Sequence, residues 1–326
     1  MSKTKILLTL FAVLIAVILY LNWPAQPSYE TIQVEHIEPQ AAVMILPPHS
    51  EPIQEMNNPP ILSQSTDSQL PCDVDRVKEL FQPYNTTLPF IQTVAFVSRV
   101  DWVCGRPAYL GDYAAYYQTS KHFIARSLRG MGNYLSDVVS KAEKFNVYRK
   151  DYPIEFHLVL DLSRLKLWLY CHDCKEDAKI LLKTYPVCAG KLDMSRRSGC
   201  LTPIGTFLIG SEFAVYQEGV KGIFKNEPCE MVSVYGKRWI PIGREIAGCS
   251  SSGKGLGLHG VPWKRLADTS AAQEQRSCIG HYETEGSIRL LTEDIEEIYA
   301  IIASKPAYLH SVKDFIDAKL PGKDSL

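Results

Sequence analysis

Apolar side chains dominate residues 6–21, and Lys3 and Lys5 precede this run. The run has 16 residues, slightly fewer than the ~17–25 that a membrane-spanning helix needs. Trp23 follows it, at the level where aromatic side chains meet lipid headgroups. We therefore predict that residues 1–22 form a single-pass membrane anchor, with the lysines inside and the rest of the chain exported.

A cleaved signal peptide is the alternative interpretation of this segment. Pro24 and Pro27 flank Ala25, so no good small-x-small cleavage site follows the apolar run. The uncleaved anchor is therefore the prediction, and both alternatives export the remainder of the chain.

Proline is concentrated in the next segment. Nine of the twenty prolines fall within residues 23–71, with Ser, Gln and Asn between them. Such a segment buries too little apolar surface to fold, so we predict a Pro-rich, disordered linker that extends from the membrane.

Helical spacing appears within residues 72–150, where Phe123, Ile124 and Leu128 share one face. Gly130 and Gly132 are expected to divide this stretch into two helices. We predict a helix-rich region there, and nothing in its residues points to a chemical role.

From residue 154 the apolar period changes to two. Residues 154–160 and 165–169 alternate apolar and polar side chains around a turn at 161–164, which predicts a hairpin. Further strands are predicted over 180–188, 202–207 and 231–242, and a helix over 290–304. Many short strands with one late helix predict a mostly β domain, built as a β-sandwich or partly open barrel.

Composition excludes several classes of function. The net charge of −1 argues against a broad nucleic-acid-binding surface, so we predict no nucleic-acid partner. Residues 253–257 are rich in glycine but lack the upstream glycine of a phosphate-binding loop. The histidines show no metalloprotease spacing. We therefore predict no cofactor and no metal.

Nine cysteines suit an exported compartment where disulfides persist, and their odd number leaves at least one without an intramolecular partner. Cys171 and Cys174 lie between two predicted strands, which favours a small disulfide at a hairpin. A zinc site would need two more ligands at matching spacing, and no second cysteine pair supplies them.

Candidate chemistry lies in the last quarter of the chain. His259 and Gly260 are adjacent, and Gly286, Ser287 and Arg289 follow after a short span. A serine hydroxyl attacks a carbonyl only when a base removes its proton, and His259 is the obvious base. Glycine allows a tight turn and close approach of a substrate.

These motifs resemble the L,D-transpeptidase family (YkuD-type catalytic domain). That family carries a His-Gly pair followed by Ser/Thr-x-Gly-Cys-Ile/Val-Arg-Leu/Met. Here residues 284–290 read TEGSIRL, with Asp294 and an Ile-Tyr pair at 298–299 in the following helix. Residues 202–207, TPIGTF, are similar to a strand motif of the same family. The resemblance covers residues 154–312 and implies the family's mostly β catalytic fold.

The resemblance also implies a reaction. L,D-transpeptidases act on peptidoglycan stem peptides, attack the carbonyl of the third residue and expel the terminal D-Ala. An amine then forms a 3-3 cross-link, or water completes an L,D-carboxypeptidase reaction. Ser287 takes the nucleophile position and His259 the base position. The backbone at Gly260 would orient the imidazole, and the amide region at Gly286 would face the oxyanion. Arg289 would either hold the structure or bind a substrate carboxylate. The implied location is the bacterial inner membrane, with the catalytic domain in the periplasm.

The serine is a departure from the family, whose nucleophile is a cysteine. A serine hydroxyl is far less acidic than a thiol, so catalysis requires a well-oriented histidine. Glu283 and Glu285 are candidates for the orienting group, and His281 is a reserve base on an insertion over residues 264–283.

Two alternatives stay open. Cys278 follows His259 by nineteen residues, close to the family spacing, and is the alternative nucleophile. The residues after Cys278 do not continue the family motif, whereas those after Ser287 do, so the motif favours Ser287. A disulfide between Cys249 and Cys278 would exclude both thiols. Alternatively, the serine inactivates the domain, and the protein only binds or scaffolds the cell wall.

Overall fold

The computed structural model describes residues 70–130, 139–265 and 272–324. The predicted anchor (1–22) and almost all of the predicted linker (23–71) lie outside these residues. Within them, no helix combines the length and apolar character that crossing a bilayer would require. All of the described residues belong to one compact unit, within Pro59–Leu326.

Three short helices and a two-stranded sheet form the first part of the described chain. They are α2 (Val77–Phe81), β1 (Ile91–Ala95), α3 (Leu110–Tyr116), α4 (Lys121–Arg129) and β2 (Lys144–Tyr148). The hydroxyl of Ser120 accepts a hydrogen bond from the N–H of Phe123 and caps α4. Gly130 ends α4 with a φ of 72°, as predicted. The second predicted helix falls largely on residues 131–138, outside the described chain.

Sequence periodicity missed the pairing of β1 with β2. The two strands run antiparallel, with Ile91 opposite Tyr148 and Ala95 opposite Lys144. The region therefore mixes helices with a small sheet and is less uniformly helical than predicted. Each strand has only five residues, too few for alternation to stand out from the neighbouring helical pattern.

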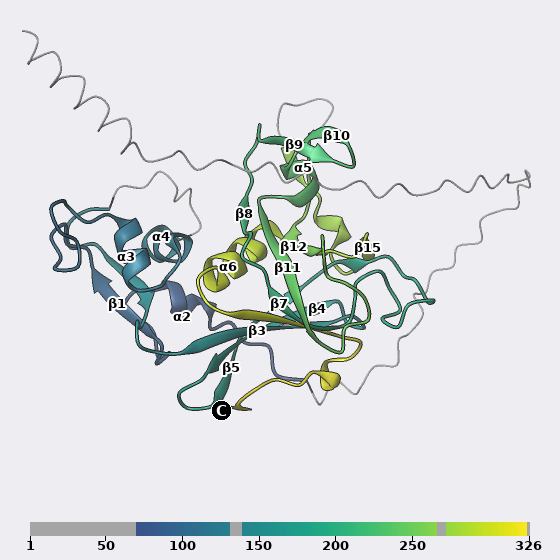
Figure 1. Ribbon diagram of the computed structural model, residues 1–326, viewed down its shortest axis with the longest axis horizontal. Helices are drawn as coiled ribbons and strands as arrows, with labels where there is room; N and C mark the ends of the chain where they lie inside the picture. The colour runs from purple at the N-terminus through teal and green to yellow at the C-terminus, as the bar shows by residue number, and fades with distance from the viewer. Residues whose placement is uncertain (1–69, 131–138, 266–271, 325–326) are drawn as a thin grey trace, which may run out of the picture. The chain divides into compact units, whose positions relative to one another are not determined.

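The remaining chain is mostly β, as predicted, and its strands form a main sheet with smaller two-stranded sheets beside it (Figure 1). The main sheet contains β3 (Ile154–Asp161), β4 (Lys166–Asp173), β5 (Ala178–Pro186), β7 (Gly205–Ile209), β8 (Ala214–Val215), β11 (Arg238–Ala247), β12 (Gly257–Gly260), β16 (Ile288–Leu290), β17 (Ala307–Val312) and β18 (Lys323–Asp324). The shorter strands are β6 (Ala189–Gly190), β9 (Lys221–Phe224), β10 (Glu227–Glu230), β13 (Trp263–Arg265), β14 (Ala272–Glu274) and β15 (Tyr282–Thr284).

The main sheet is one continuous path, in the order β16-β12-β11-β7-β17-β3-β4-β5-β18. The prediction was a mostly β domain built as a β-sandwich or partly open barrel; its mostly β character is confirmed, and the structure adds that the strands form a single bent path. The reason lies in β11, whose pairing with β7 shifts register twice between Ile242 and Ala247. Such irregularities bend a strand and increase its twist. The sheet therefore changes direction at β11.

The predicted hairpin at residues 154–173 is confirmed by the eight paired positions of β3 and β4. Asp161 ends β3 with a fully buried carboxylate. Its Oδ1 accepts from the N–H groups of Ser163 and Arg164 and from the Ser163 hydroxyl, and its Oδ2 accepts from Arg164 Nη1 and the N–H of Phe315. One side chain therefore closes the turn and holds the C-terminal 3-10 helix at Phe315–Asp317.

The strand predicted over residues 231–242 is only partly correct. Residues Val232–Tyr235 form a helical turn, α5, and β11 begins at Arg238. Gly236 separates the two with a φ of 61°, and a Cβ there would lie 2.6 Å from the carbonyl oxygen of Val261. A chain reversal that needs glycine therefore interrupts what reads in sequence as one apolar run.

Helix α6 (Thr292–Ile302) confirms the predicted late helix and packs beside β11 and β12 (Figure 1). The helix-rich region contacts the same helix. Ser120 donates to the carbonyl of Ala300 and Tyr148 donates to the carbonyl of Ile301, at 2.9 and 2.8 Å. These bonds satisfy carbonyls in the last turns of α6, so the helix-rich region braces the element that supports the site strands.

Candidate active site

The candidate site is a row of residues across four neighbouring strand segments. His259 on β12 lies opposite Arg289 on β16 and opposite Trp239 on β11. Cys188 forms a bridge with Arg289 on the other side, through two backbone hydrogen bonds of 2.9 Å. Directly paired residues place their side chains on the same face of a sheet, so these four side chains share one face.

Ser287 belongs to this face as well. It precedes Arg289 by two residues, and alternate residues along an extended chain point to the same side. Its Oγ accepts a hydrogen bond of 3.3 Å from the N–H of Gly257, the residue two before His259. The predicted nucleophile, base and cation, Ser287, His259 and Arg289, therefore lie on a common surface of β12 and β16.

The imidazole of His259 is oriented by the backbone. Its Nδ1 lies 2.8 Å from the carbonyl oxygen of Gly260. A carbonyl only accepts, so Nδ1 carries the proton in the neutral ring and Nε2 is left with the lone pair. This is the tautomer that a general base acting through Nε2 requires.

Aromatic side chains enclose the same ring. Tyr235 meets it edge-on at 5.4 Å between centroids, and Trp239 stacks against it at 5.9 Å. Burial lowers the pKa of His259 to about 4, although hydrogen bonds with the backbone of Gly260 and Tyr235 favour the protonated ring. His259 is therefore neutral near pH 7, the protonation state of a base, although this pKa makes it a weak one.

In the part of the chain that is described, no hydrogen bond joins Ser287 Oγ to the His259 ring. Neither candidate glutamate orients the histidine. Glu285 is exposed and pairs with Lys191 at 2.8 Å, and Glu283 is also exposed. The group bonded to the ring is the carbonyl of Gly260, at the position whose backbone the family resemblance implied would orient the imidazole.

The backbone conformation at residue 286 requires a glycine. Its φ is 121°, and a Cβ would lie 3.0 Å from the carbonyl oxygen of Leu201. Its N–H contacts Thr284 Oγ1 at 3.1 Å, so this amide would have to leave that bond to face an oxyanion. Its carbonyl accepts from Thr202 Oγ1, which in turn accepts from the N–H of Gly190. Thr202, predicted only as part of a strand motif, therefore holds the backbone next to the predicted nucleophile, Ser287.

Cys278 lies beside Arg289 rather than beside Cys249. It lines a cavity of about 320 Å³ together with Arg289, Glu283 and Phe224, and it packs against Cys188 in a small buried cluster. All described cysteines are free, so the proposed Cys249–Cys278 disulfide is wrong. Cys249 instead contacts the carbonyl of Thr206 at 3.4 Å.

The two thiols of this cluster differ in acidity. A hydrogen bond with Cys188 and the charge of Arg289, acting against the effect of burial, together lower the pKa of Cys278 to about 7. The same bond raises the pKa of Cys188. Cys278 is therefore the first of the pair to lose its proton, which gives the alternative nucleophile a physical basis. Cys188 was missed because its partners are distant in sequence.

The insertion over residues 264–283 includes parts of a hairpin and a 3-10 helix. Strands β13 and β14 pair, and Arg276–Cys278 form the helix. Glu274 accepts from the N–H of Thr292 and caps α6, at 2.7 Å. His281 is exposed and its Nδ1 lies 3.2 Å from the carbonyl oxygen of Ile279.

Comparison with known proteins identifies the family of this domain. The model of the L,D-transpeptidase catalytic domain (YkuD) matches residues 155–310, close to the predicted span of 154–312. A comparison with curated proteins found no match.

Two similar solved structures are the helical cell shape determining protein Pgp2 from Campylobacter jejuni and L,D-transpeptidase 1 from Mycobacterium tuberculosis. Pgp2 is 15% identical over 52% of this chain and 51% of its own, with a TM-score of 0.31. The mycobacterial protein is 14% identical over 52% of this chain and 78% of its own, with a TM-score of 0.26. The chain thus spans about half the length of Pgp2.

Proposed function

Because residues 155–310 form an L,D-transpeptidase catalytic domain, we propose that the protein modifies peptidoglycan by acyl transfer on stem peptides, with Ser287 as nucleophile. The observation that carries the proposal is the parallel register of β12 and β16, which brings Ser287, His259 and Arg289 to one face. Arg289 supplies a planar cation suited to a carboxylate of the donor peptide. The products are 3-3 cross-links when an amine accepts the acyl group, or a shortened stem peptide when water does.

The proposed reaction has two halves. Ser287 Oγ attacks the donor carbonyl while His259 Nε2 takes the hydroxyl proton. The C–N bond to the terminal D-Ala breaks, and the imidazolium returns the proton to the departing amine. An acceptor amine or water then attacks the resulting ester, loses its proton to His259 and releases Ser287, whose Oγ recovers that proton.

The direct test of this proposal is incubation of the full chain with a tetrapeptide donor, followed by mass spectrometry of the products. Release of D-Ala, with or without a cross-linked dimer, is the expected result. A folded protein that yields neither product nor acyl-enzyme would rule out the enzymatic function.

The pH dependence of acylation distinguishes the two nucleophiles. The pKa of His259 is lowered to about 4, so the base is active above that pH and is lost as the pH falls through it. Acylation of Ser287 should therefore stay level between about pH 5 and 7 and fall by half near pH 4. Attack by Cys278, whose pKa is about 7, would instead decline tenfold per pH unit below neutrality.

The measurement is the rate of carbapenem adduct formation, followed by intact-protein mass spectrometry across this range. Far-UV circular dichroism at each pH separates loss of the base from acid unfolding. An acidic limb near pH 7 that disappears in Cys278→Ser would transfer the nucleophile role to Cys278.

A second candidate function is a non-catalytic protein that binds or scaffolds the cell wall. One observation favours it. Ser287 Oγ bonds to the backbone of Gly257 and the His259 ring bonds to that of Gly260, so these two side chains are not hydrogen-bonded to each other. Under this candidate, Ser287→Ala retains binding to wall fragments, and no variant forms an acyl-enzyme.

We further propose that residues 1–22 anchor the protein in the inner membrane and that the linker over 23–71 places the catalytic domain in the periplasm. Membrane fractionation of the full chain against a variant lacking residues 1–22 tests the anchor. A full chain found only in the soluble periplasmic fraction would favour the cleaved signal peptide.

A further inference from the structure

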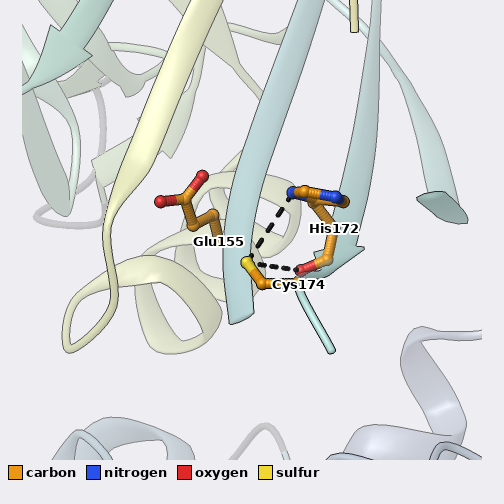
Figure 2. Close-up of side chains that lie close together, drawn as sticks. All are labelled: Glu155, His172 and Cys174. Carbon is orange, nitrogen blue, oxygen red and sulfur yellow. Dashed lines mark hydrogen bonds between the residues drawn. The ribbon is translucent and has the colours of Figure 1, made fainter. Parts of the chain in front are cut away.

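A second cluster of chemically active side chains lies at the end of the β3–β4 hairpin, apart from the site row. Glu155 on β3 lies opposite His172 on β4, and Cys174 follows β4 by one residue. One ligand atom from each, a carboxylate oxygen, an imidazole nitrogen and the thiol sulfur, lie within 4.8 Å of one another (Figure 2). A short sequence motif cannot contain all three residues, because Glu155 comes from the neighbouring strand.

The spacing of the atoms suits a tetrahedral ion. Cys174 Sγ lies 3.7 Å from His172 Nδ1 (Figure 2). Ligands at about 2.3 Å for Zn–S and 2.0–2.1 Å for Zn–N stand roughly 3.5 Å apart in a tetrahedral site. The pair therefore needs only a small adjustment to bind one ion.

The other nitrogen of His172, Nε2, holds the ring in an orientation suited to metal binding through Nδ1. Its Nε2 lies 3.2 Å from Asp177 Oδ1. Metal-ligating histidines commonly donate their second N–H to a carboxylate, which fixes the tautomer and strengthens the ligand nitrogen. Asp177 thus leaves Nδ1, the atom that faces Cys174, with the lone pair.

An unpartnered buried nitrogen points independently to a missing ligand. His157 is only 5% exposed, and its Nε2 has no hydrogen-bond partner. Glu155 Oε2 lies 3.8 Å from this nitrogen. Its Nδ1 is engaged with His310 Nε2 at 2.9 Å, so the ring is held in place. A buried polar atom without a partner is costly, and water on an ion bound by Glu155 would give it one.

The cluster is also accessible. Glu155 and Cys174 line a cavity of about 410 Å³. The lysines at its rim, Lys150 and Lys305, lie over the rings of Tyr116 and Tyr148. An ion can therefore approach two of the three ligand residues, Glu155 and Cys174, from this cavity without unfolding of the hairpin.

The alternative use of Cys174, a disulfide with Cys171, is not formed. Cys171 is fully buried in the core, and both thiols are free. Cys171 lies within β4 with its side chain on the core face, whereas Cys174 lies in the exposed turn that follows. The hairpin disulfide predicted from sequence is therefore wrong, and the CxxC spacing has another use.

We propose that Glu155, His172 and Cys174 bind one divalent ion of the zinc class, with solvent in the fourth position beside His157. A thiolate, an imidazole and a carboxylate together favour zinc over calcium or magnesium, which take oxygen ligands. Three protein ligands leave one position open for water. The ion would join β3 to the turn after β4.

Cobalt substitution tests this site. The detergent-solubilised full chain is reduced, stripped with a chelator and titrated with Co²⁺, and thiolate-to-cobalt charge transfer is followed in the near ultraviolet. One equivalent should bind and be displaced by Zn²⁺. Cys174→Ser should abolish the band, and His172→Gln should weaken affinity by more than the ~10–100-fold typical of outer-shell changes. Asp177→Asn should weaken it within that range.

Cys229→Ser is the matched control, because Cys229 is a partly exposed cysteine on β10, outside the cluster. It should keep the band and the affinity. The thermal midpoints of the metal-free variants establish that each still folds. A band that persists in Cys174→Ser but vanishes in Cys278→Ser would assign the metal to the Cys188–Cys278 pair and overturn the proposal. Absence of stoichiometric binding by the wild-type chain would overturn it equally.

Discussion

Ser287→Ala is expected to reduce acyl-enzyme formation by at least about 10³-fold, because removal of a nucleophile leaves only binding and oxyanion contributions. Its Oγ makes one bond of 3.3 Å with the N–H of Gly257, and the residue is only partly buried. The change should therefore leave the fold intact. The measurement is intact-protein mass spectrometry after incubation with a carbapenem or a tetrapeptide donor, with peptide mapping of the adduct.

Two further variants make this result interpretable. Cys278→Ser should retain the adduct, because the thiol is outside the proposed reaction. Ser287→Cys should acylate at least about tenfold faster than the wild type, since a thiol ionises more readily beside an imidazole. A wild-type adduct mapped to Cys278 would show that Cys278, on the other side of Arg289, is the nucleophile instead of Ser287. If neither the wild type nor Ser287→Cys forms an adduct, the wall-binding function is the one that survives.

Asp161→Ala is expected to lower the free energy of unfolding by about 3–5 kcal/mol, the cost of breaking a buried, charge-assisted network. The carboxylate is fully buried and receives five hydrogen bonds, from Ser163, Arg164 and Phe315. Its removal breaks the 2.6 Å ion pair with the Arg164 guanidinium, which is 7% exposed and also lies 3.3 Å from Asp314. The measurement is the urea midpoint of the chain, with the slope checked against that of the wild type.

The chain contains a matched control for this prediction. Asp193 forms the same kind of turn in an Asp-x-Ser-Arg sequence, with bonds to the N–H and hydroxyl of Ser195 and to Arg196 Nε. Its side chain is 31% exposed, whereas that of Asp161 is 0% exposed. Asp193→Ala should leave the urea midpoint close to the wild-type value, because water replaces the lost carboxylate. Equal losses in the two variants would show that burial is not the source of the effect.

The sequence by itself predicted the mostly β domain and its family. Alternation over β3 and β4 predicted the hairpin, and the structure buries both faces of these strands. Phe156 and Leu158 belong to the main core, whereas Val159 belongs to a second buried cluster. The motif around Ser287 gave the family, because its chemistry depends on residues close together in the chain. The roles of Ser287 and His259 and the boundaries of the four predicted segments stay predictions.

Only the tertiary structure decided which distant groups meet. The pairing of β12 with β16 set His259 beside Arg289, the approach of Cys188 lowered the pKa of Cys278, and the β3–β4 pairing brought Glu155 to Cys174. Each depends on strand register, and a slip of one residue would send every side chain to the opposite face. Local sequence fixes the period of a strand but not its partner. For this reason the sequence revealed the fold class and the family of the domain at residues 155–310, whereas the acidity of the thiols and the candidate metal site depend on the packed sheet.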